Sequence, residues 1–234
     1  MISKNKIQLW IIPTKGEYKP VTDLERDLSK SLSPFRTKIF LLSRGYIREV
    51  LSKYLDIPAL EIPLVAEPGK PPVLKNNLGY ISLSHCQDAL FFGWSNINLG
   101  IDIEKKERHF KPISIIKRFY LPEEKNDLEV LSVEELRLNT LKYWVLKEAA
   151  IKWQKGSISS DLSKWLISSN FKKAIHVDKN ISLNIRYLEF ESWSLGIAYN
   201  QSAIDIRPII SSKTKSNLSI IIKLIIFVLI IIGI

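Results

Sequence analysis

The chain has 234 residues, of which 46% are hydrophobic, and a formal net charge of +10. This length and apolar content are enough for one large core or two small ones, which excludes a globally disordered protein. The basic balance favours an acidic partner such as nucleic acid, an anionic membrane, a polyphosphate ligand or an acidic protein, although a solvated lysine-rich surface would give the same charge.

Cysteine is nearly absent, because Cys86 stands alone and cannot form an internal disulfide. No Cys/His spacing is typical of zinc. The apolar run at residues 7–12 is short and interrupted by Gln8 before Pro13, unlike a signal peptide. These features predict a cytoplasmic protein.

In the first part of the chain, residues 7–12 predict a strand. A serine N-cap followed by proline then starts a long helix over residues 34–55. Arg44 and Arg48 lie one turn apart on one flank of this helix, where a solvated face is the simplest expectation.

The proline-rich segment 57–77 cannot form a regular helix, and within it Gly69-Lys70-Pro71-Pro72 predicts an exposed loop that offers a cation. Three strands follow, near residues 80–84, 89–95 and 99–104. We expect residues 96–98 to form the turn of a hairpin that joins the last two.

The second part of the chain predicts a short helix from Leu121, then a capping box at Ser132 and Glu135. The box opens a helix that we expect to run to about Lys155 and to end at Gly156. Strands are predicted over residues 174–177, 181–190 and 193–200.

This order of elements predicts an α+β protein with two similar-sized halves that meet near residue 100. We place the first half at residues 1–100 and the second at 101–210, with a polar linker and hydrophobic tail at 211–234. As a helix, the apolar run 220–234 would span about 22 Å, short of the ~30 Å hydrocarbon core of a membrane. We therefore favour no membrane contact through residues 218–234, with peripheral contact left open.

Two carboxylates mark the start of the second half. In a strand, Asp102 and Glu104 share a face about 6.6 Å apart, while Ile101 and Ile103 point into a core. Such a pair can hold Mg²⁺, which prefers oxygen ligands. The alternative is an acidic strand end that faces solvent.

A third carboxylate, Glu148, lies on the edge of the core-facing stripe of the second long helix, four residues after Trp144. An unpaired carboxylate there would be costly. Lys152 could pair with it as a purely structural contact. With Lys147 adjacent, the same residues would also suit a metal-bound polyphosphate.

In chain order, "GKPP" and "ISLSH" (69–85), "LGIDIE" (99–104) and "YWVLKEAAIK" (143–152) resemble the 4′-phosphopantetheinyl transferase superfamily. The resemblance is to the single-chain, pseudo-dimeric, Sfp-like type, in its cyanobacterial heterocyst-region branch, and covers roughly residues 7–200. It implies a monomer whose halves are in pseudo-twofold arrangement, each a small antiparallel sheet packed with a long helix.

The resemblance implies transfer of 4′-phosphopantetheine from coenzyme A to a serine of an apo acyl or peptidyl carrier protein, with adenosine 3′,5′-bisphosphate as the other product. It implies Mg²⁺, which Mn²⁺ could replace, held by Asp102, Glu104 and Glu148. Glu148 and Lys152 would be catalytic. The implied coenzyme-binding residues are Arg44, Lys70, Ser84, His85, Lys147 and Lys152.

An acidic carrier protein would account for the positive charge, with no role for nucleic acid. Two alternatives remain open from the residues alone. A Mg²⁺-dependent nucleotide or nucleic-acid hydrolase would also use the three acids, although no aromatic-basic surface pattern supports it. A membrane-associated scaffold would use the tail but leave the acids unexplained.

Overall fold

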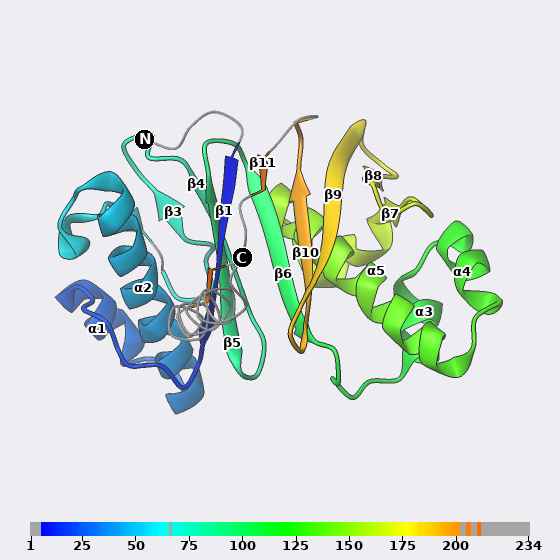
Figure 1. The fold of residues 1–234 in the computed structure, drawn as a ribbon, viewed down its shortest axis with the longest axis horizontal. Helices are drawn as coiled ribbons and strands as arrows, with labels where there is room; N and C mark the ends of the chain where they lie inside the picture. Colours follow the sequence, from blue (N-terminus) through cyan, green and yellow to red (C-terminus); the bar gives the residue numbers. More distant parts are fainter. Residues whose placement is uncertain (1–5, 66, 202–204, 207–209, 212–234) are drawn as a thin grey trace, which may run out of the picture.

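The computed structural model describes residues 6–65, 67–201, 205–206 and 210–211 and has the predicted α+β class (Figure 1). The helices are α1 (Asp23–Ser29), α2 (Pro34–Leu55), α3 (Pro112–Phe119), α4 (Pro122–Glu129), α5 (Val133–Gln154) and α6 (Ile158–Asp161), with short 3₁₀ turns η1 (Ala59–Glu61) and η2 (Leu162–Lys164). The strands are β1 (Lys6–Pro13), β2 (Leu64–Val65), β3 (Val73–Leu74), β4 (Tyr80–His85), β5 (Ala89–Ser95), β6 (Leu99–Lys105), β7 (Trp165–Ile167), β8 (Lys173–His176), β9 (Ile181–Phe190), β10 (Trp193–Tyr199), β11 (Asp205–Ile206) and β12 (Ile210–Ser211).

The strands form two main sheets and one small hairpin. The first sheet has the order β11-β1-β5-β4, with β12 also paired to β1; the second has the order β6-β10-β9-β8-β7; and β2 pairs with β3. In the part of the chain that the structure describes, the strand pairs are antiparallel except those of β11 and β12 with β1, which are parallel. The C-terminal strands thus return to the first sheet, and the predicted boundary at residue 100 falls inside β6.

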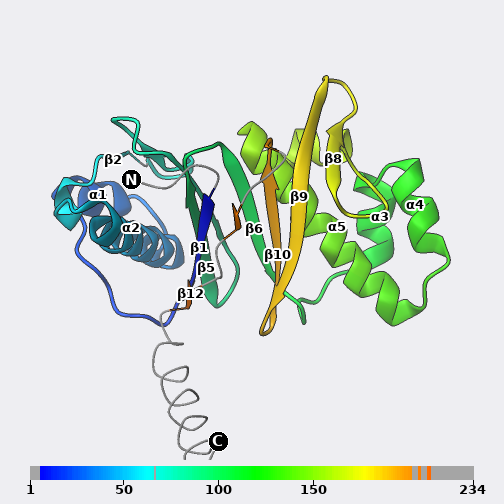
Figure 2. The same cartoon turned by 45° about the horizontal axis from the view of Figure 1, so that its top comes forward.

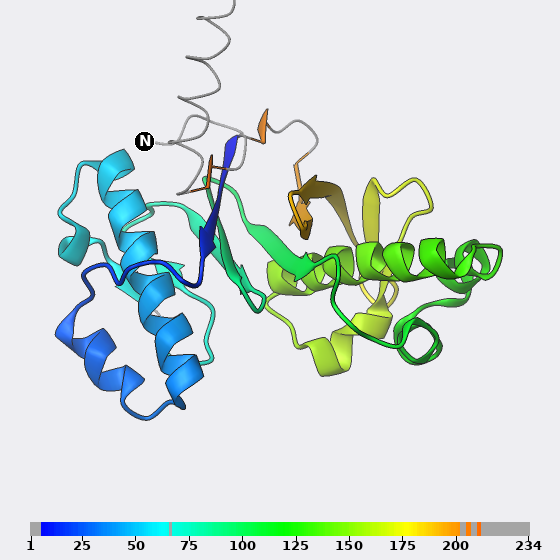
Figure 3. The ribbon, with the colours of Figure 1, turned by 60° about the horizontal axis from the view of Figure 1, so that its bottom comes forward.

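The two sheets lie between the long helices, with α2 on one outer side and α5 on the other (Figures 1, 2 and 3). Strand alternation produces this arrangement, because successive side chains point to opposite faces. Ile7 and Leu9 of β1 meet Ile101 and Ile103 of β6 in a core between the sheets. Trp10, which follows Leu9 and points to the opposite face of β1, packs in the core beneath α2.

The hairpin predicted at residues 96–98 is wrong. Strand β5 already has β1 on one side and β4 on the other, so it has no free edge for β6. The chain instead leaves the first sheet after β5 and enters the second as β6, which pairs with β10.

The long helix α5 begins as predicted and lies very close to β6. The Ser132 side chain accepts a hydrogen bond from the backbone N–H of Glu135, whose carboxylate accepts one from Ser132 N–H. The helix ends at Gln154, and its C-cap Lys155 takes the left-handed conformation (φ 58°), one residue before the predicted stop at Gly156. A Cβ on Gly100 would lie 1.9 Å from the carbonyl oxygen of Ala149, so only glycine allows this approach.

The solvated face predicted for α2 is also wrong, because Arg44 and Arg48 are only 4% and 3% exposed. Helix α1, which was not predicted, covers this flank and supplies Glu25 as a buried partner for Arg48 at 3.0 Å. Among the described residues, no helix combines the length and apolarity needed to cross a membrane. Of the linker and tail predicted at residues 211–234, residue 211 belongs to strand β12, and residues 212–234 lie outside the described part of the chain.

Candidate active site

Three carboxylates come together where β6 faces α5. Asp102, Glu104 and Glu148 each offer an oxygen within 4.8 Å of the others. Asp102 is 2% exposed and Glu148 is 7% exposed. The alternative of an acidic strand end that faces solvent is therefore wrong.

The backbone of each element explains this meeting. Gly100, Asp102 and Glu104 alternate onto the face of β6 that α5 covers. Because the helix backbone at Ala149 rests against Gly100, the neighbouring Glu148 reaches the two strand carboxylates. The glycine of the "LGIDIE" motif thus brings the acids of two elements together.

A hydrogen-bonded network fixes one oxygen of Asp102 and leaves the other unsatisfied. Asp102 Oδ1 accepts from Ser84 Oγ at 2.7 Å and from Lys152 Nζ at 2.6 Å. Lys152 Nζ also lies 2.7 Å from Ser84 Oγ and 3.8 Å from Glu148 Oε2. Asp102 Oδ2 is buried without a hydrogen-bond partner among the described residues, which is costly unless a cation meets it.

The cluster carries more negative charge than its neighbours neutralise. Burial, followed by the charge of Asp102, raises the pKa of Glu148 to about 8, although Lys152 acts in the opposite direction. Burial and Asp102 also raise the pKa of Glu104 to about 7, against the effect of Arg108, with which Glu104 forms an ion pair. A bound divalent cation would remove both strains.

His85 stands at the exposed end of β4, one residue after Ser84. Loss of hydration lowers the pKa of its ring, and Lys152 lowers it further, while Asp102 raises it. The charges of the cluster therefore act on His85, and the lowered pKa favours its neutral form.

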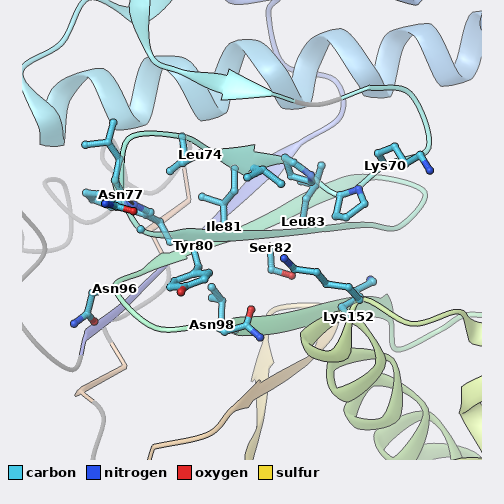
Figure 4. Close-up of a pocket in the computed structure, with 18 of the residues that line it drawn as sticks. Lys70, Leu74, Asn77, Tyr80, Ile81, Ser82, Leu83, Asn96, Asn98 and Lys152 are labelled. Atoms are coloured by element: carbon cyan, nitrogen blue, oxygen red, sulfur yellow. Dashed lines mark hydrogen bonds between the residues drawn. The ribbon is translucent and has the colours of Figure 1, made fainter.

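A cavity of about 770 Å³ opens beside Lys152. Its wall includes the Gly69-Lys70-Pro71-Pro72 loop, strand β4 and the end of α5 with Lys152 and Lys155 (Figure 4). In the close-up, Lys152 reaches from α5 toward Ser82 of β4, while the Lys70 side chain points away from the other labelled side chains. The cavity thus combines cations with apolar walls, as a site for a large anionic ligand requires.

Several cavity residues were missed by sequence reasoning. The structure adds Lys155, Asn77, Asn96 and Asn98 to the lining. Lys155 could have been found, since it follows Lys152 at the same helix end. The asparagines carry no spacing signal and become neighbours only through the fold.

Two predicted coenzyme-binding cations do not reach the cluster or the cavity. Lys147 is fully buried and pairs with Glu124 at 2.7 Å. Arg44 stacks over the Phe40 ring at 4.4 Å, and its buried charge interacts with Glu25 and Arg48. The structure therefore brings together Asp102, Glu104, Glu148, Lys152 and Ser84, with His85 and Lys70 nearby, but neither Lys147 nor Arg44.

Comparisons with a family model and with curated proteins all point to one group of enzymes. Residues 98–206, which contain all three carboxylates, match the family model of the 4′-phosphopantetheinyl transferase superfamily. The 4′-phosphopantetheinyl transferase HetI of Nostoc sp. is 28% identical over 161 residues, covering 63% of this chain and 68% of that protein. Sfp of Bacillus subtilis, which bears the same enzyme name, is 28% identical over 148 residues, with 62% of each chain covered.

A third relative, the 4′-phosphopantetheinyl transferase psf-1 of Bacillus pumilus, is 31% identical over 128 residues, or 53% of each chain. The chain thus spans between about half and two thirds of the length of these curated relatives. The region that matches the family model includes the strand and helix that carry the acidic cluster.

Proposed function

Because this chain belongs to the 4′-phosphopantetheinyl transferase superfamily of enzymes, we propose that it transfers the 4′-phosphopantetheine group of coenzyme A to a serine hydroxyl of an apo acyl or peptidyl carrier protein. Adenosine 3′,5′-bisphosphate is the second product. The reaction depends on Mg²⁺, which Mn²⁺ can replace.

One observation carries this proposal: a buried set of three carboxylates lies beside a cavity lined by lysines. The donor set fits Mg²⁺, which prefers oxygen ligands at about 2.1 Å, so that opposite oxygens lie about 4.2 Å apart. Ligand oxygens within 4.8 Å of one another are close to that spacing. The unpaired Oδ2 of Asp102 supports the same assignment.

Asp102, Glu104 and Glu148 would hold the ion, which would neutralise the coenzyme pyrophosphate and polarise its phosphorus. Lys152, fixed by Ser84, presents its ammonium group at the edge of the cavity. There it stabilises negative charge on the phosphate oxygens. Lys70, which lines the cavity, and His85, which follows Ser84 at the end of β4, would contribute to coenzyme binding.

The chain must also remove one proton. The serine oxygen forms a bond to the phosphorus that bears pantetheine, and the bond from that phosphorus to the bridging oxygen breaks, so that adenosine bisphosphate leaves with the electron pair. Glu148 accepts the serine proton at its carboxylate, directly or through water.

The net charge of +10 supports an acidic carrier protein as the partner, because long-range attraction speeds the encounter. We propose that one chain suffices, since a single copy contributes both sides of the cavity. We place the reaction in the cytoplasm.

Intact mass spectrometry of an apo acyl carrier protein tests this function. After incubation with the purified protein, coenzyme A and Mg²⁺, we expect the carrier to gain one phosphopantetheine group, and a chelator should prevent the gain. No gain with several carrier proteins would contradict the proposal. Release of nucleotide from coenzyme A without a mass gain would instead favour the hydrolase alternative.

A further inference from the structure

The ion pair between Lys147 and Glu124 lies one residue from the acidic cluster but points away from it. Both side chains are fully buried, and Lys147 Nζ lies 2.7 Å from Glu124 Oε2. The ammonium group also donates to the carbonyl oxygens of Trp165 at 2.5 Å and Leu162 at 3.2 Å. Every contact that the structure gives this cation is therefore to the protein core.

Glu124 connects further elements to the same point. Its carboxylate accepts hydrogen bonds from the backbone N–H of Leu121 at 2.9 Å and of Ile167 at 2.8 Å. Helix α4, strand β7 and helix α5 are thus tied together through one buried carboxylate and one buried ammonium group.

The first half contains the same arrangement. Glu25 and Arg48 lie 23 residues apart, as Glu124 and Lys147 do, and form a buried pair at 3.0 Å. Glu25 also accepts the backbone N–H of Thr22 at the start of α1, as Glu124 does for Leu121 at the start of α4. Arg48 donates to the Ile62 carbonyl at 2.7 Å, as Lys147 does to carbonyls after α5.

Because the same kind of pair occurs in both halves, its role does not depend on coenzyme binding. On the side of the first sheet that α2 covers, β1 presents Trp10 and Ile12, which pack in an apolar core. No acidic cluster of metal-binding type occurs there among the described residues. A buried pair of this kind therefore anchors both 22-residue helices, α2 without an acidic cluster and α5 with one.

We propose that the pair of Lys147 and Glu124 is a positioning device that sets the rotation of α5 and thereby directs Glu148 at Asp102 and Glu104. Adjacent residues of a helix point about 100° apart, so fixing the direction of Lys147 fixes that of Glu148. The contact of Ala149 with Gly100 sets how closely the helix approaches. This inference rests on the proposed function only in taking Glu148 as a metal ligand.

The test measures binding of Mn²⁺ alone by electron paramagnetic resonance, so its outcome does not depend on transfer to a carrier. Lys147→Met and Glu124→Gln should each weaken Mn²⁺ binding about tenfold, the usual effect of losing a group that orients a ligand. The double variant should bind Mn²⁺ no less tightly than the single variant with the lower affinity, because both changes break the same interaction. At saturating Mn²⁺, the KM for coenzyme A should stay within about twofold of the parent value.

Arg48→Met is the matched control. It should lower the urea midpoint, because it leaves Glu25 buried without its partner, but leave Mn²⁺ affinity unchanged within about twofold. If this control lost as much Mn²⁺ affinity, general destabilisation would explain the loss in the Lys147 and Glu124 variants, and the proposal would be overturned.

Two further outcomes would overturn it. One is parental Mn²⁺ affinity in folded Lys147→Met together with a raised KM for coenzyme A, which would make Lys147 a coenzyme contact. The other concerns Lys147→Arg, which keeps the positive charge and reproduces the arginine–glutamate pair of Arg48 and Glu25. This variant remains informative if Lys147→Met does not fold. This variant should bind Mn²⁺ within about threefold of the parent, so a tenfold loss in the folded protein would contradict the assignment.

Discussion

At the scale of single residues, Glu148 joins the helix to the acidic cluster and carries the strongest prediction. Glu148→Gln should lower the rate of phosphopantetheine transfer at least a hundredfold, because the amide neither accepts the serine proton nor holds a cation with comparable strength. The circular dichroism spectrum should not change, since the substitution is isosteric.

Glu49→Gln is the control for that variant. Glu49 pairs with Lys53 on α2, four residues apart, as Glu148 does with Lys152 on α5. Because Glu49 lies far from the cluster and is partly exposed, transfer should proceed at the parental rate. Near-normal transfer by Glu148→Gln would remove both roles assigned to this carboxylate.

The raised pKa of Glu148 predicts how the stability of the metal-free protein depends on pH. The folded protein binds this proton up to a pKa of about 8, against the ordinary value of 4.5, so the folded state holds more protons than the unfolded state between these values. Melting temperature measured with chelator should therefore fall as pH rises from about 5 to about 8. Added Mg²⁺ should raise it more at pH 8 than at pH 5.5, when the carboxylates are free to bind.

The contribution of Glu148 is isolated by subtraction. His85 and His176 have pKa values lowered from 6.5, which makes stability rise with pH below about 6.5 and partly offsets the carboxylates there. The difference in melting temperature between parent and Glu148→Gln removes the histidine contribution. If the two proteins showed the same slope, the pKa of Glu148 would not be raised in the folded protein.

Much of the cluster was predictable because local rules place it. Alternation along a strand puts Asp102 and Glu104 on one face, and a capped amphipathic helix puts Glu148 on the stripe toward the core. The burial of Lys147 was not predicted by these rules, because the direction of its side chain depends on Glu124, a partner on helix α4. Arg44 and Arg48 were placed in solvent for a related reason, since α1 covers them.

At the scale of elements, the contact between α5 and β6 depends on Gly100. Gly100→Ala would bring a Cβ to 1.9 Å from the Ala149 carbonyl and 2.4 Å from Trp153 N, both rigid backbone atoms. The helix must then move away, and we expect a loss of roughly 2 kcal/mol or more in the free energy of unfolding in urea. Mn²⁺ affinity should fall as well, because Glu148 retreats with the helix.

Gly69→Ala provides the comparison for that variant. Gly69 has no atom within 4 Å of the added Cβ, but its φ of 77° strains any other residue by about 1 to 2 kcal/mol. We expect a smaller loss of stability and parental Mn²⁺ affinity. Unchanged stability in Gly100→Ala would mean that the helix does not need this close approach.

The long elements were also predicted more reliably than the pairing of strands. Caps and periodicity mark α2 and α5 within the local sequence. The failure at residues 96–98 came from β1, which lies far back in the chain and occupies the edge of β5 that a hairpin would need. Strands as short as β11 and β12 have too few residues for a pattern and exist only through their pairing with β1.

At the scale of the whole molecule, the cavity and the cluster are built from residues between Leu55 and Gly156. Removal of residues 212–234 should therefore leave the rate of carrier modification within about twofold of the parent. Truncation after Gln201 should lower the urea midpoint, because it also removes the backbone pairs of β11 and β12 with β1. Loss of transfer in the first truncation would show that the tail belongs to the catalytic machinery.

The pairing of β11 and β12 with β1 has a consequence for synthesis of the protein. Ribosomes deliver β1, β4 and β5 early, but β11 and β12, which pair with the other edge of β1, emerge only after the strands β6 to β10 have been made. During that interval the nascent first sheet presents an open strand edge, which can pair with a neighbouring chain. The yield of native protein should therefore depend on how many unfinished copies share a polysome, and on how quickly translation reaches the last strands.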